Sequence, residues 1–209
     1  MVGLLLEGIV SSGKTSVIRE LQTRKRWVER SSKLILSDLF TVRANEHLRS
    51  RNERTYRTLM RQNLDVLEAA HEIEIASQLA SPGSGRDLAY VLERFHISNA
   101  IDYADGNFEA YRDIDATLAT LGCRGVVLTV PDMFAGARIR ETFERRGPRW
   151  KAYCEKLEAR VGDVGRHFLA KQEQIKAGAR WSSMEFRVIE TTERDWRMAV
   201  DAVLEFWRI

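Results

Sequence analysis

A short stretch near the N-terminus combines glycines, a lysine and a threonine at the spacing of a phosphate-binding loop. Gly8 to Thr15 form the string GIVSSGKT, one residue after the apolar run Val2 to Leu6. In such a loop, glycine lets backbone N–H groups approach an anion, lysine contacts the outer phosphates and threonine ligates magnesium. The alternative is a glycine-rich turn without a ligand, which the flanking strand and helix patterns disfavour. We therefore expect ATP to bind through Gly8, Ser11, Ser12, Gly13, Lys14, Thr15 and Ser16, with Mg2+ on Thr15.

Two charged residues end another apolar run, Leu88 to Glu93. Glu93 is the last residue of that run and Arg94 follows it. In open parallel sheets, ligands bind beyond the carboxyl ends of the strands, so both side chains are expected to face the phosphate loop. A carboxylate there can hold magnesium through water, and an arginine can reach a phosphoryl group in transfer. We expect Glu93 to serve the metal and both residues to take part in catalysis; a solvated surface ion pair is the alternative.

Asp38 follows a third apolar run, Lys33 to Ser37. A carboxylate at that strand end can act as a general base and accept a proton from an acceptor hydroxyl. It can equally be the N-cap of a helix beginning near Leu39, since aspartate is favoured at that position. The sequence leaves both interpretations of Asp38 open.

Short apolar runs alternate with longer helical patterns, which is typical of parallel strands joined by crossover helices. We expect a single α/β domain over residues 1–209, built as a three-layer α/β/α sandwich around a five-stranded parallel sheet. The expected strands are Val2 to Glu7, Lys33 to Ser37, Leu88 to Glu93, Gly125 to Val130 and Phe186 to Glu190. The expected helices are Lys14 to Thr23, Glu53 to Leu79, Phe108 to Leu121 and Trp196 to Trp207.

Composition narrows the class of protein. The 33 basic and 30 acidic residues give a net charge of +3, too small an excess to indicate nucleic-acid binding. The two cysteines, Cys123 and Cys154, show no metal-binding spacing. The apolar N-terminal run is too short for a signal sequence and no stretch is long enough to span a bilayer. We expect a cytoplasmic protein that acts on a small molecule and has neither membrane nor nucleic-acid partners. A homodimer is compatible with the sequence.

Two motifs together resemble the thymidylate kinase and deoxynucleoside kinase group of phosphate-loop enzymes. Those enzymes carry EGxxGxGKT at the first strand and (D/E)R(Y/F/S)xxS at the third, and this chain has EGIVSSGKT from Glu7 and ERFHIS from Glu93. The resemblance implies that Arg94 positions phosphate and that Glu93 supports the metal or the acceptor site. It also implies that Val188 to Thr192 flank the donor adenine.

The same resemblance implies a lid over the donor phosphates, at about residues 136–150. Arg138 is the lid residue that we expect to bind ATP, and Arg140, Arg145, Arg146 and Arg149 accompany it. The spacing of many relatives would place a second arginine at Thr142. The family often has an acidic residue followed by proline after the second strand, where this chain has Asp38 followed by Leu39.

A second basic group falls in the region that covers the acceptor in the resembling enzymes. Many guanidinium groups would suit an anionic acceptor such as a nucleoside monophosphate. An ordinary charged helix face, with acidic residues between the basic ones, is the alternative. The residues are Arg43, Arg49, Arg51, Arg54, Arg57 and Arg61.

These observations favour an ATP-dependent phosphotransferase that moves the terminal phosphoryl group of ATP to a nucleoside, a nucleoside monophosphate or a similar small metabolite. Its expected cofactors are ATP and Mg2+. The alternative function is a nucleotide-dependent switch or partner-binding NTPase. The arginine-rich lid segment and the short chain favour the phosphotransferase.

Overall fold

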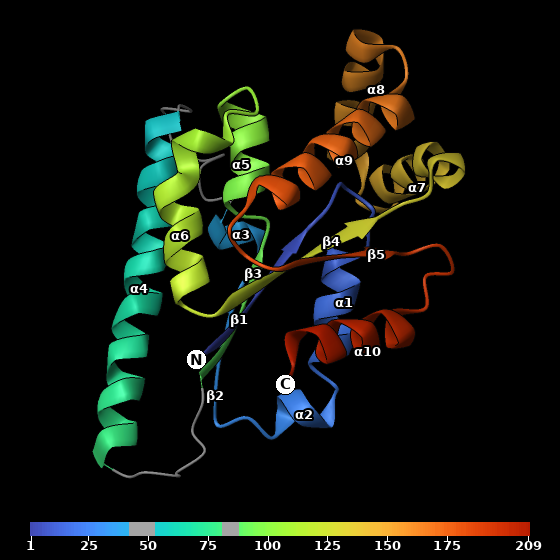
Figure 1. Ribbon diagram of the computed structural model, residues 1–209. Coiled ribbons are helices and arrows are strands. Elements are labelled where there is room, and N and C mark those ends of the chain that lie inside the picture. The colour runs from blue at the N-terminus through green and yellow to red at the C-terminus, as the bar shows by residue number, and fades with distance from the viewer. Residues whose placement is uncertain (42–52, 81–87) are drawn as a thin grey trace.

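A five-stranded parallel sheet lies at the centre of the described part of the chain (Figure 1). The computed structural model describes residues 1–41, 53–80 and 88–209. The strand order is β2-β3-β1-β4-β5, and helices cover both faces, which confirms the three-layer α/β/α sandwich. The strands are β1 (Val2–Glu7), β2 (Ser32–Leu36), β3 (Leu88–Glu93), β4 (Cys123–Thr129) and β5 (Phe186–Glu190).

Alternate side chains of β1 enter the two faces of the sheet, as the period of a strand requires. Leu4 and Leu6 pack in a core with α1 (Lys14–Leu21) and α10 (Trp196–Trp207). Leu5 packs on the opposite face, where the helices are α4 (Glu53–Ala80) and α6 (Arg112–Thr120). The short helix α2 (Lys25–Val28) adds Trp27 to the first core. Because both faces are covered, β1 is almost entirely apolar up to Glu7.

The register places the ends of β1 and β3 side by side. Leu6 is the partner of Glu93 across the β1–β3 pair, and Glu7 is the partner of Val127 across the β1–β4 pair. The phosphate loop and the Glu93–Arg94 pair therefore leave the sheet at the same edge.

Helices also line that edge of the sheet (Figure 1). A third core joins the phosphate loop, through Ile9, to the helices α7, α8 and α9. The elements at this edge are α3 (Asp38–Thr41), α5 (His96–Tyr103), α7 (Asp132–Arg145), α8 (Pro148–Val161) and α9 (Val164–Trp181). The proposed lid segment, 136–150, thus falls on α7 and the start of α8. No helix among the described residues is long and apolar enough to cross a membrane.

The sequence predictions of β1, β3, β5 and the span of α10 are confirmed, and several other bounds were wrong. β4 begins at Cys123 rather than Gly125, because the charged residue Arg124 lies inside the strand and donates to the backbone O of Phe206 at 2.6 Å. β2 spans Ser32–Leu36, since α3 begins at Asp38. The helix predicted from Phe108 to Leu121 is a 3-10 turn, Phe108–Tyr111, followed by α6.

The sequence analysis also missed α5, α8 and α9. The buried face of α9 includes Val164, Phe168, Gln172, Ile175 and Ala179, which recur at intervals of three and four residues. A polar residue in the middle of that face and glycines at both ends weaken the apolar pattern. The helix forms because its face packs against α5, α7 and α8, and such partners are not visible in a local pattern.

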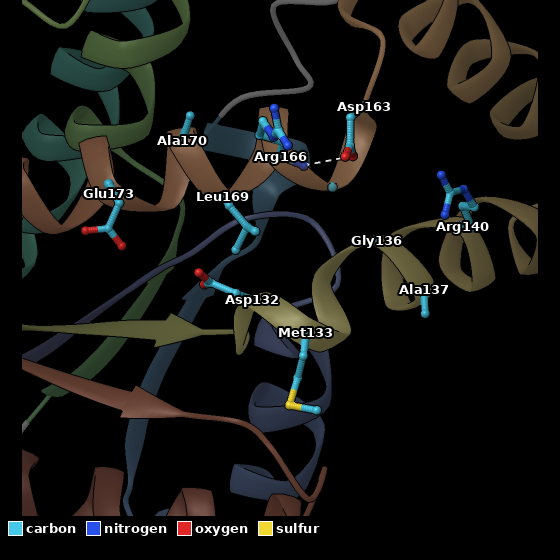
Figure 2. Close-up of a pocket in the computed structure, with 11 residues that line it drawn as sticks. Asp132, Met133, Gly136, Ala137, Arg140, Asp163, Arg166, Leu169, Ala170 and Glu173 are labelled. Atoms are coloured by element: carbon cyan, nitrogen blue, oxygen red, sulfur yellow. Dashed lines mark hydrogen bonds between the residues drawn. The ribbon is translucent and has the colours of Figure 1, made fainter.

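The helices α7 and α9 approach closely where two glycines meet. A Cβ atom on Gly165 would lie 2.9 Å from Cα of Gly136, closer than real Cβ contacts. A Cβ atom on Gly136 would meet nothing nearer than 3.7 Å, at Nη1 of Arg140. A pocket of about 770 Å3 opens beside this crossing, with Asp132 and Leu169 on one side of Gly136 and Arg140 on the other (Figure 2).

We predict that Gly165→Ala lowers the free energy of unfolding by about 1–3 kcal/mol, because the added methyl group meets backbone that has to shift. Gly136→Ala is the matched control. It should be neutral or stabilise the protein by up to about 1 kcal/mol, since alanine favours a helix interior. Urea unfolding of the two variants measures the difference. Equal stabilities would contradict the close approach of the two helices.

Candidate nucleotide-binding site

The phosphate loop has the backbone conformation that only glycine adopts without strain at two points. Gly8 and Gly13 have φ angles of 146° and 93°. A Cβ on Gly8 would lie 2.5 Å from the backbone O of Leu128, and one on Gly13 would lie 2.2 Å from the ring of Trp196. Gly13 is also the N-cap of α1 and supplies no side-chain cap to it. The first turn of α1 is thus presented to an anion through its backbone.

Ser11 forms the contact between the loop and α7. Its φ angle is 69°, in the left-handed region, where the resembling motif has glycine. A left-handed residue other than glycine costs roughly 1–2 kcal/mol. Oγ of Ser11 donates to Oγ1 of Thr142 at 2.8 Å, which offsets part of that cost. Thr142, at the position where an arginine was expected, therefore joins the tip of the loop to α7.

Lys14 is folded back along the loop. Its Nζ donates to the backbone O of Gly8 at 2.7 Å and of Ile9 at 2.8 Å, and the residue is 7% exposed. Burial, together with a smaller effect of the charge of Arg94, lowers the pKa of Lys14 to about 8 against the opposing effect of Glu93. The ammonium is thus held by carbonyl oxygens that a phosphate oxygen can replace.

Thr15 and Glu93 meet at the start of α1. Oγ1 of Thr15 donates to Oε1 of Glu93 at 3.3 Å, and Glu93 is 4% exposed. Thr41 of α3 fixes the backbone there, because its Oγ1 donates to the O of Glu93 at 2.6 Å. A hydroxyl and a carboxylate are the oxygen donors that a hard cation such as Mg2+ prefers, so this pair has the chemistry to hold one.

Arg94 lies between β3 and α5 with an unusual backbone. Its φ angle is 55°, and its N–H donates to the backbone O of Leu6 at 3.0 Å. Its Nη2 donates to Oδ2 of Asp102 at 2.9 Å. Arg94, which the sequence analysis selected, therefore lies beside the end of β1, where the loop begins. The carboxylate of Asp102 in α5 orients its guanidinium group.

Glu7 is a site residue that the sequence analysis passed over. Its carboxylate is fully buried and accepts from N–H of Phe95 at 2.9 Å, N–H of Ser98 at 3.3 Å, and the hydroxyl of Ser98. These bonds join the end of β1 to the first turn of α5. A glutamate that ends a buried apolar strand was the available signal, because such a carboxylate needs several donors.

His96 belongs to a separate buried network. Its Nε2 lies 3.0 Å from Oδ1 of Asp115. Oδ1 also accepts from the hydroxyl of Ser182, and Oδ2 accepts from N–H of Ser183 at 2.8 Å. Hydrogen bonds from these three residues hold the pKa of Asp115 well below its usual range, against the opposing effect of burial. The network joins α5, α6 and the segment before β5, so the structure gives His96 a role in packing.

Asp38 is the first residue of α3 rather than its N-cap. The backbone O of Ser37 accepts from N–H of Phe40 at 2.9 Å, so Ser37 precedes the helix and the cap interpretation was wrong by one residue. The carboxylate lies in the first turn, where a negative charge is favourable. It also lies near enough to Lys14 to raise the pKa of that lysine.

Arg138 is buried and holds the chain that follows β5. Its Nη1 donates to the backbone O of Thr191 at 2.6 Å, and its Nη2 to the O of Thr192. The residue is 6% exposed and stacks at 5.6 Å over the ring of Phe134. The segment expected to flank the donor adenine is therefore hydrogen-bonded to α7, the helix that also carries Thr142.

Other predicted arginines form ion pairs on the protein surface. Arg140 pairs with Glu158 at 2.9 Å, Arg57 with Asp113 at 3.0 Å, and Arg61 with Glu68 at 2.8 Å. These pairs fit the charged-face alternative for Arg57 and Arg61. The side chains of the remaining acceptor-covering group, Arg43, Arg49, Arg51 and Arg54, lie outside the described residues.

The fold of this chain is also found in a solved structure, over nearly the whole chain. The YorR protein of Bacillus subtilis, crystallised with phosphorylated GDP, matches with a TM-score of 0.56 and 12% identity, over 98% of this chain and 94% of its own. This likeness shows that the two chains share a fold. A thymidylate kinase of Candida albicans also matches, with a TM-score of 0.48 and 16% identity, over 98% and 90% of the two chains. No protein-family model and no curated protein sequence matches.

We predict that Lys14→Met lowers nucleotide-dependent turnover at least about 100-fold, because it removes the positive charge that we expect to contact the phosphates. The free energy of unfolding should change by no more than about 1 kcal/mol, since a desolvated ammonium is replaced by an apolar chain of similar length. Steady-state kinetics and urea unfolding measure the two quantities. Turnover close to wild type would refute the role of Lys14.

Proposed function

We propose that the protein is an ATP-dependent phosphotransferase that moves the terminal phosphoryl group of ATP to a nucleoside, a nucleoside monophosphate or a similar small metabolite. One observation carries the proposal: Lys14, the Thr15–Glu93 pair and Arg94 meet at one edge of the sheet. Phosphoryl transfer depends on positioning and on charge neutralisation, and these groups supply both.

Each residue has a distinct part in the proposed reaction. Lys14 exchanges the carbonyl oxygens of Gly8 and Ile9 for phosphate oxygens, and the backbone of the loop binds the remaining ones. Thr15 and Glu93 would hold Mg2+, which would supply positive charge to the phosphates. Arg94 donates to the phosphoryl group in transfer, where negative charge is greatest.

Asp38 is the proposed general base when the acceptor is a hydroxyl. Its position at the start of α3 puts a carboxylate on the same edge of the sheet as Glu93. A base there accepts the acceptor proton as the new P–O bond forms. A phosphate acceptor needs no such base. The Asp38→Asn variant should therefore lose activity toward a hydroxyl acceptor and keep activity toward a phosphate acceptor.

The single domain is proposed to work with α7 and the start of α8 as its lid. The contact of Thr142 with Ser11 and the bonds of Arg138 to Thr191 and Thr192 support a coupled movement of loop and lid. Closure of a lid excludes water and so protects ATP from hydrolysis.

Radiolabelled ATP tests the proposal. The protein is incubated with Mg2+ and, separately, with nucleosides, nucleoside monophosphates and hydroxylated metabolites, and label is followed in acceptor and in free phosphate. Transfer to one acceptor class that is lost in Lys14→Met supports a phosphotransferase. If label appears only in free phosphate, the phosphotransferase proposal is wrong and the protein is a nucleotide-dependent NTPase.

We predict that Arg94→Ala lowers the rate constant of phosphoryl transfer by about 100-fold or more and changes ATP affinity by less than about threefold. The reason is that an arginine at this edge acts chiefly on charge that develops in the transition state. Single-turnover kinetics and separate measurement of ATP affinity decide the matter. A loss confined to affinity would assign Arg94 to binding.

We also predict that residues 138–149 become protected from hydrogen exchange when a nonhydrolysable ATP analogue and the acceptor are both bound. Five arginines fall within this stretch of sequence, and bound phosphate would add negative charge that favours a closed arrangement. Protection in α1 serves as the control for nucleotide binding. Unchanged exchange in 138–149, with α1 protected, would remove the support for a lid.

A further inference from the structure

One carboxylate beside the proposed site is shared by two cations. Oδ2 of Asp102 accepts from Nη2 of Arg94 at 2.9 Å, and Oδ1 accepts from Nζ of Lys171. The side chains of Arg94, Asp102 and Lys171 are 25%, 22% and 17% exposed. The three charges are therefore partly shielded from water, where ion pairs are stronger than on an open surface.

The placement of Lys171 is fixed by its neighbour along α9. The side chain of Gln172 accepts from N–H of Val130 at 2.8 Å and donates to the O of Val130 at 3.1 Å. These two bonds attach α9 to the end of β4, and Gln172 is 2% exposed. Lys171 is thus brought to Asp102 by the main framework of the fold rather than by a loose surface helix.

The sharing determines how Arg94 contacts Asp102. An arginine and a carboxylate form their strongest pair when two N–H groups meet both oxygens. Here Lys171 occupies Oδ1, and Arg94 makes a single contact through Nη2 to Oδ2. With Lys171 removed, Oδ1 is open to a second N–H group of Arg94, and the carboxylate has one cation left to attract.

We propose that Lys171 is a positioning residue for Arg94. By occupying one oxygen of Asp102, it limits Arg94 to a single contact and leaves the other guanidinium donors of Arg94 for a phosphoryl group. Asp102 orients Arg94, and Lys171 prevents Asp102 and Arg94 from forming a bidentate ion pair. The inference rests on the proposed function of Arg94 in phosphoryl transfer.

Four variants test the kinetic consequence. Lys171→Met should lower kcat about tenfold and change the KM for ATP by less than about threefold, because Asp102 then takes Arg94 into a two-point pair. Lys171→Arg keeps the charge on Oδ1 and should stay within about threefold of wild type. The double variant Lys171→Met with Asp102→Asn should be more active than Lys171→Met alone, because the competing carboxylate is gone.

A purely structural role for Lys171 gives the opposite pattern. Defects would then accumulate, so the double variant would be less active than Lys171→Met. That result, wild-type kcat in Lys171→Met, or a Lys171→Arg variant as impaired as Lys171→Met would each overturn the proposal. Asp102→Asn alone is the reference that completes the cycle.

A measurement on the free protein separates this inference from the proposed function. Arginine-labelled protein is observed by NMR, with the Arg94 signal assigned through Arg94→Ala, and rotation of its guanidinium is followed. A two-point pair restrains that rotation more than a one-point pair, so Lys171→Met should slow it and Lys171→Arg should not. Absence of transfer by the wild type would end the proposed function, whereas unchanged rotation in Lys171→Met would end the role of Lys171.

Discussion

The buried carboxylate of Glu7 is the interaction on which the site depends. A charge without solvent is costly unless donors surround it, and Glu7 receives two backbone N–H groups and one hydroxyl from Phe95 and Ser98. Those donors open α5, so the end of β1 and the start of α5 are held together. Arg94 lies between β3 and that helix, and its left-handed backbone is the turn that this connection requires. The phosphate loop and Arg94 consequently form one unit.

Helix α9 supplies the second constraint. Gln172 attaches it to the backbone of Val130 at the end of β4, and Gly165 lets it approach α7. Helix α7 contacts the loop through Thr142, and α9 packs against α7. Helix α9 is therefore linked to the loop through α7. A change in the position of α7 would therefore alter its contact with Ser11 and its packing against α9. The close contact at Gly165 leaves little room for α7 to slide along α9.

Several strands and the phosphate loop could be predicted because short stretches of sequence determine them. Strands buried on both faces give continuous apolar runs, and the loop string GIVSSGKT restricts its own backbone, so β1, β3, β5 and the loop were found. The contributions of Glu7, Lys171 and α9 were missed, since each depends on a partner distant in the chain. Lys171 and Asp102 are 69 residues apart, and no spacing rule connects them. Asp38 was misplaced by one residue because helix caps are decided by backbone bonds that a propensity only suggests.

The charges of the site are arranged so that each cation already has an oxygen partner. Lys14 lies on loop carbonyls, Arg94 and Lys171 share Asp102, and Glu93 accepts from Thr15. This arrangement keeps like charges in a partly buried space from destabilising the free protein. A ligand must offer more than these partners do, so a single weak anion gains little by replacing one of them. A polyphosphate would replace several of them at once, and a bound Mg2+ would balance the charge of Glu93. The pairing of the free site therefore supports the proposal that the ligand is a metal-bound nucleotide and not a smaller anion.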